Sequence, residues 1–472
     1  MIERRKSKRH ATDDPNFPRL KTGNPQADEI LAGGFPCNSI NIVMGQPGTG
    51  KTIFAEQLLF HNADGDRPLF YVATLSEPLS KMVNYVQRFS FFDPNVLGSD
   101  VQYEDLGGVL AERGPTALLD WLTDVIKTRS PKVIVIDSFR AIHDLAMPSD
   151  DLRRFISDVA GLLSAYDVTT FLLGEYTSAD IERYPEFAVA DGIVELARQP
   201  LSTRDERFLR VLKLRGSGYR EGQHAFRITG NGLELYPRLV APRVPEDYES
   251  ATLRVPTGID GLDEITGGGL IAGTTTLVVG MTGSGKTTLA LQFVLQGLKR
   301  GEHTLFVNFQ ENPAQLRRAI GNLGTELDST HRDRFGLLYA SPVELQIDSI
   351  VVEIFETIKR GDVRRVVIDA IGDLAAAAND PQRLHDYLYS LIQHFAARGV
   401  TTLLTLETGE GFTSLTSLTD QRFSYMSDNL ISLGWDAARP ERRTIRVVKM
   451  RGSAHEAATR LLEVDSDGVR VK

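Results

Sequence analysis

The sequence has almost no cysteine, since Cys37 is the single one among its 472 residues. One thiol cannot form an intrachain disulfide framework or a cysteine-rich zinc module. The sequence also lacks an apolar run of about 18 residues, the length that a membrane-spanning helix requires, so no membrane span is predicted. Its basic start, MIERRKSKRH, is followed by ATDDP rather than by an apolar segment, which excludes a secretory signal. We therefore expect a cytoplasmic protein in which residues 1–18 form a disordered basic arm.

The sequence also has no excess of positively charged residues. The 53 Lys and Arg residues face 62 Asp and Glu residues, which gives a formal net charge of −9. Proteins that coat nucleic acid by bulk electrostatics need a basic surface, so nucleic-acid binding is not expected, although a local basic groove stays open. With 42% hydrophobic and 24% charged residues, the composition is that of a globular protein able to bury a large core.

The chain is predicted to contain the same domain twice. Two strings of the P-loop pattern lie 235 positions apart, GQPGTGKT and GMTGSGKT, and other landmarks recur at offsets between 232 and 236 residues. A carboxylate follows the next apolar strand, an aspartate ends a third strand, and a Lys-x-Arg-Gly-Ser string comes late in each half. These landmarks are Glu77 and Glu311, Asp137 and Asp369, and Lys213 and Lys449. Length alone suggests about three domains, whereas the repeat indicates two.

The boundary is predicted at a stretch where Pro237, Pro242 and Pro245 break any regular element. We expect a first domain at residues 19–238, a linker at 239–253 and a second domain at 254–472. In both halves, apolar β-branched strands alternate with amphipathic stretches of helical length. This pattern predicts an α/β fold, with a mainly parallel sheet flanked by helices on both faces.

Each P-loop predicts a nucleotide site. Backbone N–H groups of such a loop surround phosphates, the lysine reaches the β- and γ-phosphates, and the threonine hydroxyl binds Mg²⁺. The predicted nucleotide-binding residues are Gly45, Gln46, Pro47, Gly48, Thr49, Gly50, Lys51 and Thr52, and Gly280, Met281, Thr282, Gly283, Ser284, Gly285, Lys286 and Thr287. The predicted metal ligands are Thr52, Asp137, Thr287 and Asp369, although either aspartate could instead cap a helix. The expected cofactors are ATP and Mg²⁺.

Hydrolysis requires a group that orients or deprotonates the attacking water, and Glu77 and Glu311 are the candidates. A second repeated pair, Glu175 and Glu407, could sense the γ-phosphate or cap a turn, and the sequence favours neither role.

Two pairs of cations are also repeated. The pairs Lys213/Arg215 and Lys449/Arg451 each place both cations on one face of a strand. We interpret them as fingers that reach the γ-phosphate of a neighbouring subunit. A solvated strand face is the alternative reading.

This combination of duplicated motifs closely resembles the KaiC family, the clock ATPases and autokinases of the RecA-like superfamily. The resemblance extends from Leu20 to Val464, and its most specific segments are 257–264 (TGIDGLDE), 267–269 (GGG) and 449–453 (KMRGS). It implies two tandem RecA-like P-loop NTPase domains and a double-ring homo-hexamer with ATP at the subunit interfaces. It further implies weak ATPase activity in the first domain and Ser/Thr autophosphorylation in the second.

The sequence departs from the family pattern at its catalytic and regulatory positions. The family has two adjacent glutamates after the second strand, whereas this sequence reads Ser76-Glu77 and Gln310-Glu311, so the glutamate that resembles the catalytic base is replaced twice. Ser424 matches the serine phosphoacceptor, but Tyr425 replaces the threonine acceptor, so a two-site phosphorylation cycle is not expected. The sequence ends at Lys472 without the family's long tail, so regulation through such a tail is not expected either.

Three functions remain open at this point. The first is an ATP-binding hexameric signalling ATPase with autokinase activity, which acts on a signalling partner that the sequence does not identify. The second is an ATP-dependent scaffold or pseudoenzyme, which the two replaced glutamates favour. The third is a RecA-like DNA-dependent motor, which the acidic net charge disfavours.

Overall fold

The chain forms two compact units that divide between Arg238 and Leu239. The computed structural model describes residues 17–74, 79–145, 149–201, 204–242, 252–324, 328–343, 345–378, 381–408, 425–465 and 468–472. Most of the predicted arm lies outside these ranges, as do residues 243–251 of the predicted linker. Three residues of functional interest, Ser76, Glu77 and Ser424, lie outside them as well.

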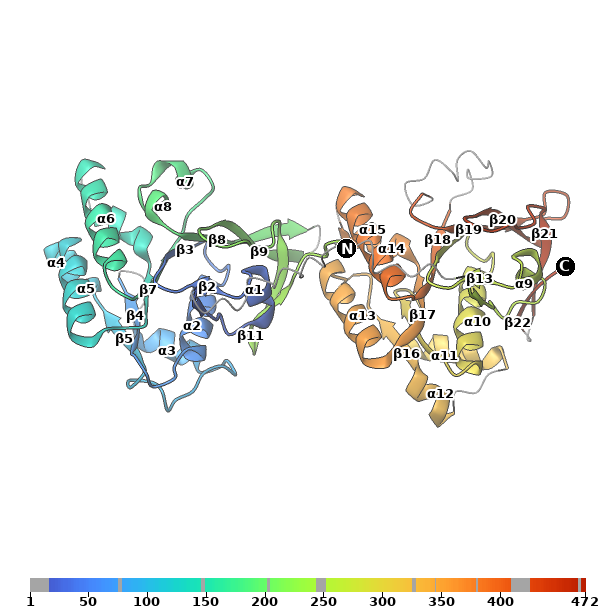
Figure 1. Ribbon diagram of the computed structural model, residues 1–472, viewed down its shortest axis with the longest axis horizontal. Helices are drawn as coiled ribbons and strands as arrows, with labels where there is room; N and C mark the ends of the chain where they lie inside the picture. The colour runs from blue at the N-terminus through green and yellow to red at the C-terminus, as the bar shows by residue number, and fades with distance from the viewer. Residues whose placement is uncertain are drawn as a thin grey trace, which may run out of the picture. The chain divides into compact units, whose positions relative to one another are not determined.

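Within the described residues, the first unit is built on a nine-stranded sheet in the order β11-β10-β9-β8-β3-β7-β6-β4-β5 (Figure 1). The strands from β5 to β8 in this order are parallel to one another, and β8, β9, β10 and β11 are antiparallel. The strand bounds are β3 Ile40–Met44, β4 Leu69–Ala73, β5 Val101–Asp105, β6 Val133–Asp137, β7 Thr169–Gly174, β8 Gly192–Leu201, β9 Arg204–Leu214, β10 His224–Thr229 and β11 Gly232–Tyr236. A separate two-stranded sheet joins β1 Arg19–Leu20 to β2 Phe35–Pro36.

The second unit repeats this topology in the part of the chain that the structure describes. Its nine-stranded sheet has the order β16-β15-β17-β18-β14-β19-β20-β21-β22, with parallel pairing from β16 to β19 and antiparallel pairing beyond. The strand bounds are β14 Thr275–Gly280, β15 His303–Asn308, β16 Phe335–Tyr339, β17 Val363–Asp369, β18 Thr401–Glu407, β19 Asn429–Trp435, β20 Arg443–Met450, β21 Arg460–Asp465 and β22 Gly468–Val471. The small sheet here joins β12 Arg254–Val255 to β13 Leu270–Ile271.

Helices cover both faces of each large sheet (Figure 1). In the first unit, α1 Pro25–Ile30, α2 Lys51–His61 and α3 Leu79–Val86 lie on one face. The opposite face holds α4 Gly107–Arg113, α5 Thr116–Arg129, η2 Phe139–Leu145, α6 Ser149–Ser164 and α8 Glu186–Val189, and α7 Asp180–Arg183 precedes α8. In the second unit, one face holds α9 Leu262–Ile265, α10 Lys286–Lys299 and α11 Pro313–Asn322. The other holds α13 Ile347–Gly361, α14 Ile371–Ala378 and α15 Pro381–Ala397, and α12 Ser329–Arg334 precedes β16.

The hydrophobic patterns explain why these elements form. A strand that is covered on both faces buries every side chain, and the five residues of β3, INIVM, are all buried. A helix that packs on one face needs a single apolar stripe, and α13 buries Ile347, Ile350, Ile354 and Ile358 at spacings of three and four residues. The predicted fold class, two tandem α/β domains with mainly parallel sheets, is confirmed. No described helix has the length and hydrophobicity to cross a membrane.

Candidate nucleotide sites

The two P-loops lie at corresponding places, after the central strands β3 and β14 and before the helices α2 and α10. Gly50 and Gly285 immediately precede these helices with a φ of 101°, a left-handed conformation that favours glycine. A Cβ atom on Gly45 would lie 2.1 Å from the carbonyl oxygen of Leu196, so the loop backbone approaches strand β8 too closely for a side chain. The glycine spacing therefore has a steric cause that is independent of any ligand.

The P-loop lysines are buried inside their own loops. Lys51 Nζ donates to the carbonyl oxygens of Gly45 and Gln46 at 2.9 and 3.0 Å. Lys286 Nζ donates to the carbonyl oxygens of Gly280 and Met281, both at 2.9 Å. Burial lowers the pKa of both lysines, and nearby carboxylates oppose this shift. Each loop thus surrounds an ammonium group, as the binding of a polyphosphate requires.

A threonine and an aspartate meet beside each lysine. Thr52 Oγ1 donates to Asp137 Oδ2 at 2.9 Å, and the carboxylate of Asp369 accepts hydrogen bonds from Thr287 and Thr405. Hydroxyl and carboxylate oxygens are the ligands that Mg²⁺ prefers. The structure thus brings together the two predicted metal ligands of each unit.

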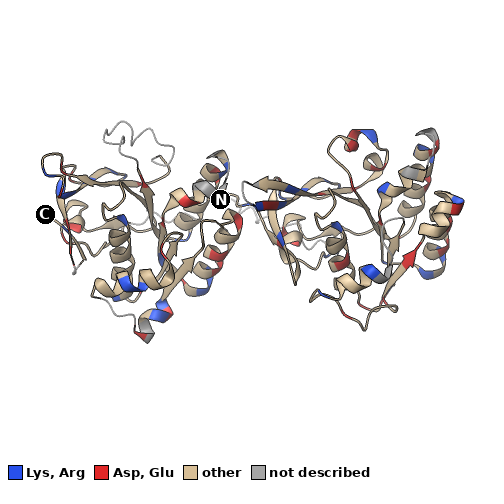
Figure 2. Ribbon diagram, turned by 180° about the vertical axis from the view of Figure 1, so that it is seen from behind, with Lys and Arg blue, Asp and Glu red and all other residues tan. Residues whose placement is uncertain are grey.

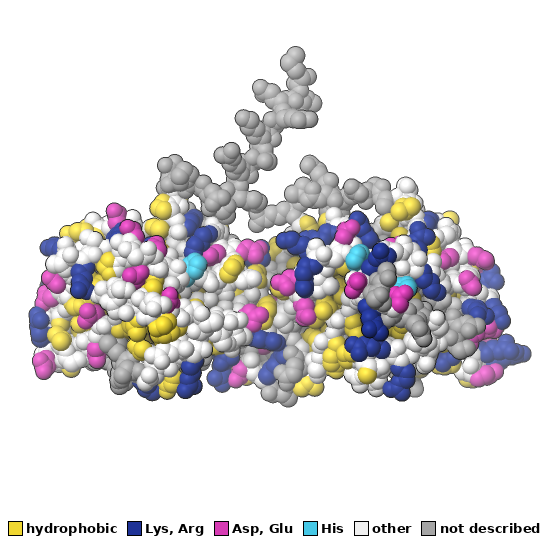
Figure 3. Space-filling view, turned by 90° about the horizontal axis from the view of Figure 1, so that it is seen from below, with side chains coloured by type: hydrophobic (Ala, Val, Ile, Leu, Met, Phe, Trp, Pro, Cys, Tyr) yellow, Lys and Arg dark blue, Asp and Glu magenta, His cyan; other side chains and the backbone are white. Residues whose placement is uncertain are grey.

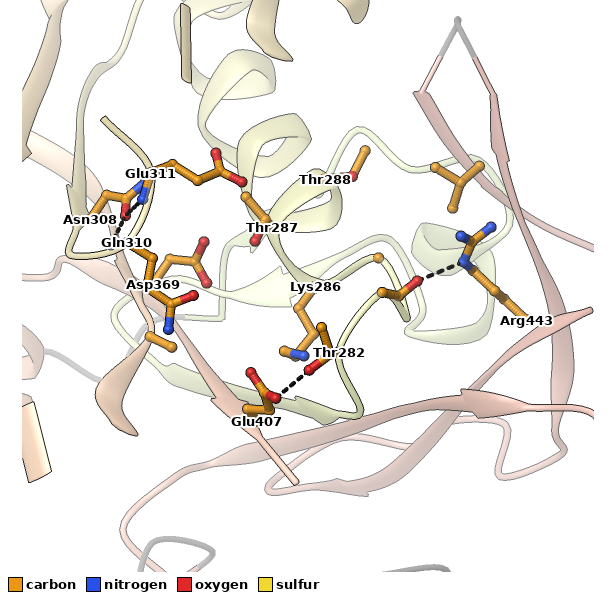
Figure 4. Close-up of a pocket in the computed structure, with 14 residues that line it drawn as sticks. Thr282, Lys286, Thr287, Thr288, Asn308, Gln310, Glu311, Asp369, Glu407 and Arg443 are labelled. Carbon is orange, nitrogen blue, oxygen red and sulfur yellow. Dashed lines mark hydrogen bonds between the residues drawn. The ribbon is translucent and has the colours of Figure 1, made fainter. Parts of the chain in front are cut away.

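The second unit contains a cavity of about 320 Å³ between its P-loop and the ends of the neighbouring strands (Figure 4). Its lining residues are Thr282, Gly283, Gly285, Lys286, Thr287, Thr288, Asn308, Gln310, Glu311, Asp369, Ala370, Glu407, Arg443 and Val464. The Nδ2 atom of Asn308 is buried and has no hydrogen-bond partner among the described residues. A buried donor, an ammonium group and the Thr–Asp oxygens in one cavity fit a nucleotide phosphate with Mg²⁺.

Gln310 and Glu311 follow β15 and border this cavity. Asn308 Oδ1 accepts hydrogen bonds from the backbone N–H groups of both residues, at 2.8 and 3.1 Å, and so fixes the turn that carries them. Burial, and then the charge of Asp369, raise the pKa of Glu311. Gln310 Nε2 donates to Asp373 Oδ2 at 3.1 Å. Glu77, the predicted counterpart in the first unit, lies outside the described residues.

The second repeated glutamate pair lies beside the P-loops. In the second unit, Glu407 at the end of β18 accepts a hydrogen bond from the hydroxyl of Thr282 (Figure 4). Its charge opposes the fall in the pKa of Lys286, and Glu175 has the same effect on Lys51. The contact with Thr282 places Glu407 against the P-loop. From the sequence alone, this position could not be told apart from one at which the glutamate only caps a turn.

The cations of the first late pair lie away from their own P-loop. Lys213 pairs with Ile193 near the start of β8, which lies beside the start of β3, whereas the P-loop follows the end of β3. Lys213 Nζ donates to the carbonyl oxygen of Phe187, and Arg215 contacts the carbonyl of Ala188 and the carboxylate of Asp191, all at 3.3 Å. The pair therefore lies at the end of the sheet opposite the strand ends that carry its own nucleotide site.

The second pair has the same placement. Lys449 Nζ donates to the carbonyl oxygen of Ser427 at 2.6 Å, and Arg451 donates to that of Tyr425 at 3.1 Å. Burial, and then the neighbouring cation Arg451, lower the pKa of Lys449. The charge of Asp428 opposes this shift, and neither Lys449 nor Arg451 lines the cavity of the second unit.

Arg443 is a cavity residue that sequence reasoning missed. It begins β20, and its Nε atom donates to the carbonyl oxygen of Gly283 in the P-loop at 3.0 Å (Figure 4). Its guanidinium group lies 5.0 Å from the ring centre of Trp435 on the adjacent strand. Strand β20 approaches the P-loop because it pairs with β19 in the antiparallel part of the sheet. No local motif in the sequence indicates this approach.

The first unit has a buried acid near its aspartate that the second unit lacks. Glu56 on α2 is 3% exposed, and burial raises the pKa of its carboxyl group from 4.5 to about 8. The hydroxyl of Tyr103 donates to Glu56 Oε1 at 3.4 Å, and the charge of Asp137 raises the pKa further. Because Lys286 corresponds to Lys51, Leu291 is the residue of α10 that corresponds to Glu56.

We expect the replacement Glu56→Gln to change how stability depends on pH. The native state binds more protons than the unfolded state between pH 4.5 and about 8. The contribution of Glu56 to the free energy of unfolding is therefore greatest below pH 4.5 and falls by up to about 1.4 kcal/mol per pH unit as the pH rises to about 8. The neutral amide removes this loss, so the variant should unfold at a higher temperature than the wild type at pH 8. Thermal unfolding of the full chain without Mg²⁺, from pH 5 to 9, measures the effect.

Glu112→Gln on the exposed face of α4 is the matched control, because it removes the same charge from a solvated position. Parallel pH profiles for the wild type and Glu56→Gln would contradict the raised pKa.

Comparison with known proteins agrees with the duplicated architecture. A family model for the KaiC ATPase matches residues 20–240 and again residues 255–472. The circadian clock oscillator protein KaiC of a Picosynechococcus species is 28% identical over 468 residues, which are 96% of this chain and 89% of that protein. KaiC of Synechococcus elongatus is also 28% identical, over 478 residues that cover 96% of this chain and 89% of its own. KaiC 1 of a Synechocystis species is 26% identical over 480 residues, which are 97% of this chain and 91% of that protein.

Both P-loop units fall within the matched ranges, and the matches leave little of the chain uncovered. The geometry of the two sites is in keeping with ATPase domains, because each unit presents a buried P-loop lysine beside a Thr–Asp pair. The chain belongs to the KaiC family of ATPases.

Proposed function

We propose that this KaiC-family ATPase is a cytoplasmic signalling protein that binds ATP and Mg²⁺ at both P-loops and assembles as a double-ring homo-hexamer. The observation that carries the proposal is the repeated site itself. Each unit places a buried lysine, Lys51 or Lys286, beside a hydroxyl and a carboxylate at the end of a central strand. Both units therefore present the groups that a nucleotide phosphate with Mg²⁺ requires.

Each residue of the second site would have its own role in hydrolysis. Lys286 would leave its loop carbonyls and bind the β- and γ-phosphates, while Thr287 and Asp369 would hold Mg²⁺ directly and through water. Mg²⁺, once bound, neutralises charge on the phosphates and orients them for in-line attack. Glu311 would orient the attacking water from the turn that follows β15. Gln310 can hydrogen-bond to a water but cannot take its proton.

We further propose that the cation pairs act on a neighbouring copy of the chain. Lys213 and Arg215, like Lys449 and Arg451, lie at the sheet edge opposite their own P-loop. In a ring, that edge of one subunit can face the P-loop edge of the next. Cations supplied in this way raise phosphoryl transfer by roughly 10³- to 10⁵-fold in other NTPases.

A catalytically weak scaffold is the second candidate function, and Gln310 favours it. An amide in place of the expected base lowers the rate of hydrolysis without removing the nucleotide site. Such a protein would bind ATP in order to assemble and to dock a signalling partner. A DNA-dependent motor is less well supported, because acidic and basic residues are interspersed over the ribbons in Figure 2 and on the face seen in Figure 3.

Incubation with γ-labelled ATP and Mg²⁺ tests the proposed activities. We expect Mg²⁺-dependent release of labelled phosphate, and label retained on the chain at Ser424, because that serine matches the family's acceptor. Chemical quantification of released phosphate and mass-spectrometric mapping of the retained label measure the two outcomes. Ser424→Ala is the control for the mapped position.

The outcomes separate the candidate functions. Release without retained label would limit the function to ATPase activity. Neither release nor label, with nucleotide still bound, would support the scaffold.

A further inference from the structure

The two aspartates that we propose as Mg²⁺ ligands each accept a hydrogen bond from a hydroxyl group on a neighbouring strand, and the two units use opposite neighbours. In the first unit, the hydroxyl of Tyr71 on β4 donates to Asp137 Oδ2. In the second unit, the hydroxyl of Thr405 on β18 donates to Asp369 Oδ1. Strands β4 and β18 lie on different sides of the aspartate-bearing strand, because β6 lies between β4 and β7 and β17 lies between β15 and β18.

The strand register shows that the two units have equivalent neighbouring positions beside the aspartate and place the hydroxyl at opposite ones. Asp137 is paired with Ala73 on one side and with Leu173 on the other. Asp369 is paired with Asn308 on β15, and the pairing of β17 with β18, continued by one residue, places Thr405 beside it.

Tyr71, two residues before Ala73, therefore corresponds to Phe306, and Leu173 corresponds to Thr405. Each unit has a hydroxyl at one of these two positions and an apolar side chain at the other.

The environment of Tyr71 suits it to hold a carboxylate. The side chain is 0% exposed, and its ring stacks on that of Tyr103 with centroids 5.4 Å apart. Burial, followed by the charge of Asp137, raises the pKa of the Tyr71 phenol well above 10, so the hydroxyl stays protonated and donates. Asp137 Oδ2 also accepts from Thr52 at 2.9 Å. The two donors on one oxygen fix the orientation of the carboxylate.

We propose that Tyr71 is the positioning residue for the Mg²⁺-binding aspartate of the first unit, and that Thr405 has this role in the second. The inference rests on the proposed binding of Mg²⁺ and nucleotide at Asp137 and Thr52. Tyr71 would act through Asp137 and through Thr52, with which its hydroxyl also forms a side-chain hydrogen bond. Outer hydrogen-bond partners of metal ligands change metal affinity by about 10- to 100-fold when they are removed. Mg²⁺ affinity at the first site should therefore depend on one phenol group that the second site does not have.

The test isolates the first site in a Lys286→Ala background and replaces Tyr71 with phenylalanine. Phenylalanine is the residue at the corresponding position of the second unit, Phe306. The same fold in this chain therefore already packs a phenylalanine ring at that position. A fluorescent ATP analogue is titrated onto the protein in EDTA and then at increasing Mg²⁺ concentrations. We expect Tyr71→Phe to need about 10- to 100-fold more Mg²⁺ for the same gain in affinity, with the affinity in EDTA unchanged.

Two further variants make the result specific. Tyr103→Phe removes a hydroxyl from the ring that stacks on Tyr71, but this hydroxyl donates to Glu56 and not to Asp137. It should leave the Mg²⁺ dependence as it is. Adding Leu173→Thr to Tyr71→Phe supplies a hydroxyl from β7, as Thr405 does in the second unit, and should restore the Mg²⁺ dependence.

The outcomes distinguish this inference from the function on which it rests. An unchanged Mg²⁺ requirement in Tyr71→Phe would overturn the positioning role, and so would an equal shift in Tyr103→Phe. A loss of affinity that is as large in EDTA as in Mg²⁺ would also overturn it, because a metal-positioning role acts only when metal is bound. If the background protein itself bound no nucleotide at the first site, the proposed function would fail and the inference with it.

Discussion

Lys286→Ala is expected to remove one of two nucleotides bound per chain, and Lys51→Ala the other. Each ammonium group is buried and makes two hydrogen bonds to loop carbonyls, from which it can move directly onto a phosphate. Removal of one member of a buried, hydrogen-bonded charge pair costs about 2–5 kcal/mol, which is a loss of affinity of about 30- to 5,000-fold. Nucleotide released from the purified, denatured protein can be counted by ion-exchange chromatography.

Lys299→Ala is the matched control, because Lys299 is an exposed lysine at the opposite end of α10. It should keep both nucleotides. Lys51→Ala is further expected to impair hexamer assembly, which light scattering during gel filtration measures. Two nucleotides per chain in both P-loop variants would show that the sites are assigned wrongly.

Gln310→Glu is expected to raise ATP hydrolysis at the second site by about 10²- to 10⁴-fold, the usual contribution of a general base. Gln310 borders the cavity, and Asn308 fixes the turn that carries it. A carboxylate there would face Asp373, which Gln310 now contacts at 3.1 Å. Two acids at this distance raise the pKa of one of them, which makes that carboxylate a stronger base near neutral pH. Steady-state phosphate release, with kcat separated from KM, measures the gain.

Gln315→Glu introduces the same charge on α11, where the side chain caps the helix rather than borders the cavity. It should leave the rate at the wild-type level. A rate unaffected by Gln310→Glu would mean that Glu311 already acts as the base, or that the second unit binds nucleotide without turning it over. Glu311→Gln separates these cases, because only the first of them loses activity in that variant.

The parts of each site that short motifs encode could be predicted from the sequence. A P-loop fixes its own backbone within eight residues, so the motif alone predicts the positions of Lys51 and Lys286 and of their threonines. The positions of Asp137 and Asp369 can be predicted because a carboxylate that ends an apolar strand reaches the same end of the sheet as the P-loop. Thr52 and Asp137 do meet at 2.9 Å.

Other residues depend on which strands are neighbours, and that information is not local. Tyr71 and Thr405 contact the aspartates across a strand pairing between segments 66 and 36 residues apart in the sequence. Arg443 reaches the P-loop from a strand 160 residues later. Asn308 is an exception, because the sequence alone indicates its role. An Asn two residues before Gln310 is typical of a turn that the Asn side chain stabilises by a hydrogen bond to the backbone.

The interpretation of the cation pairs depends on a neighbouring copy of the chain. The structure places Lys213, Arg215, Lys449 and Arg451 at the edge opposite their own P-loops. The position of the P-loop of another subunit is a property of the assembly, which a single sequence does not encode locally. Their role as fingers therefore stays a prediction, and so does that of Glu77, which lies outside the described residues.

The most direct test of the two-site ATPase is the rate of ADP formation by the wild-type chain with ATP and Mg²⁺, measured beside the double variant Lys51→Ala/Lys286→Ala. We predict slow, Mg²⁺-dependent ADP formation by the wild type and none above the buffer rate by the double variant. Equal rates for the two proteins, or a wild-type rate that does not depend on Mg²⁺, would contradict the assignment of these P-loops as the sites of ATP hydrolysis.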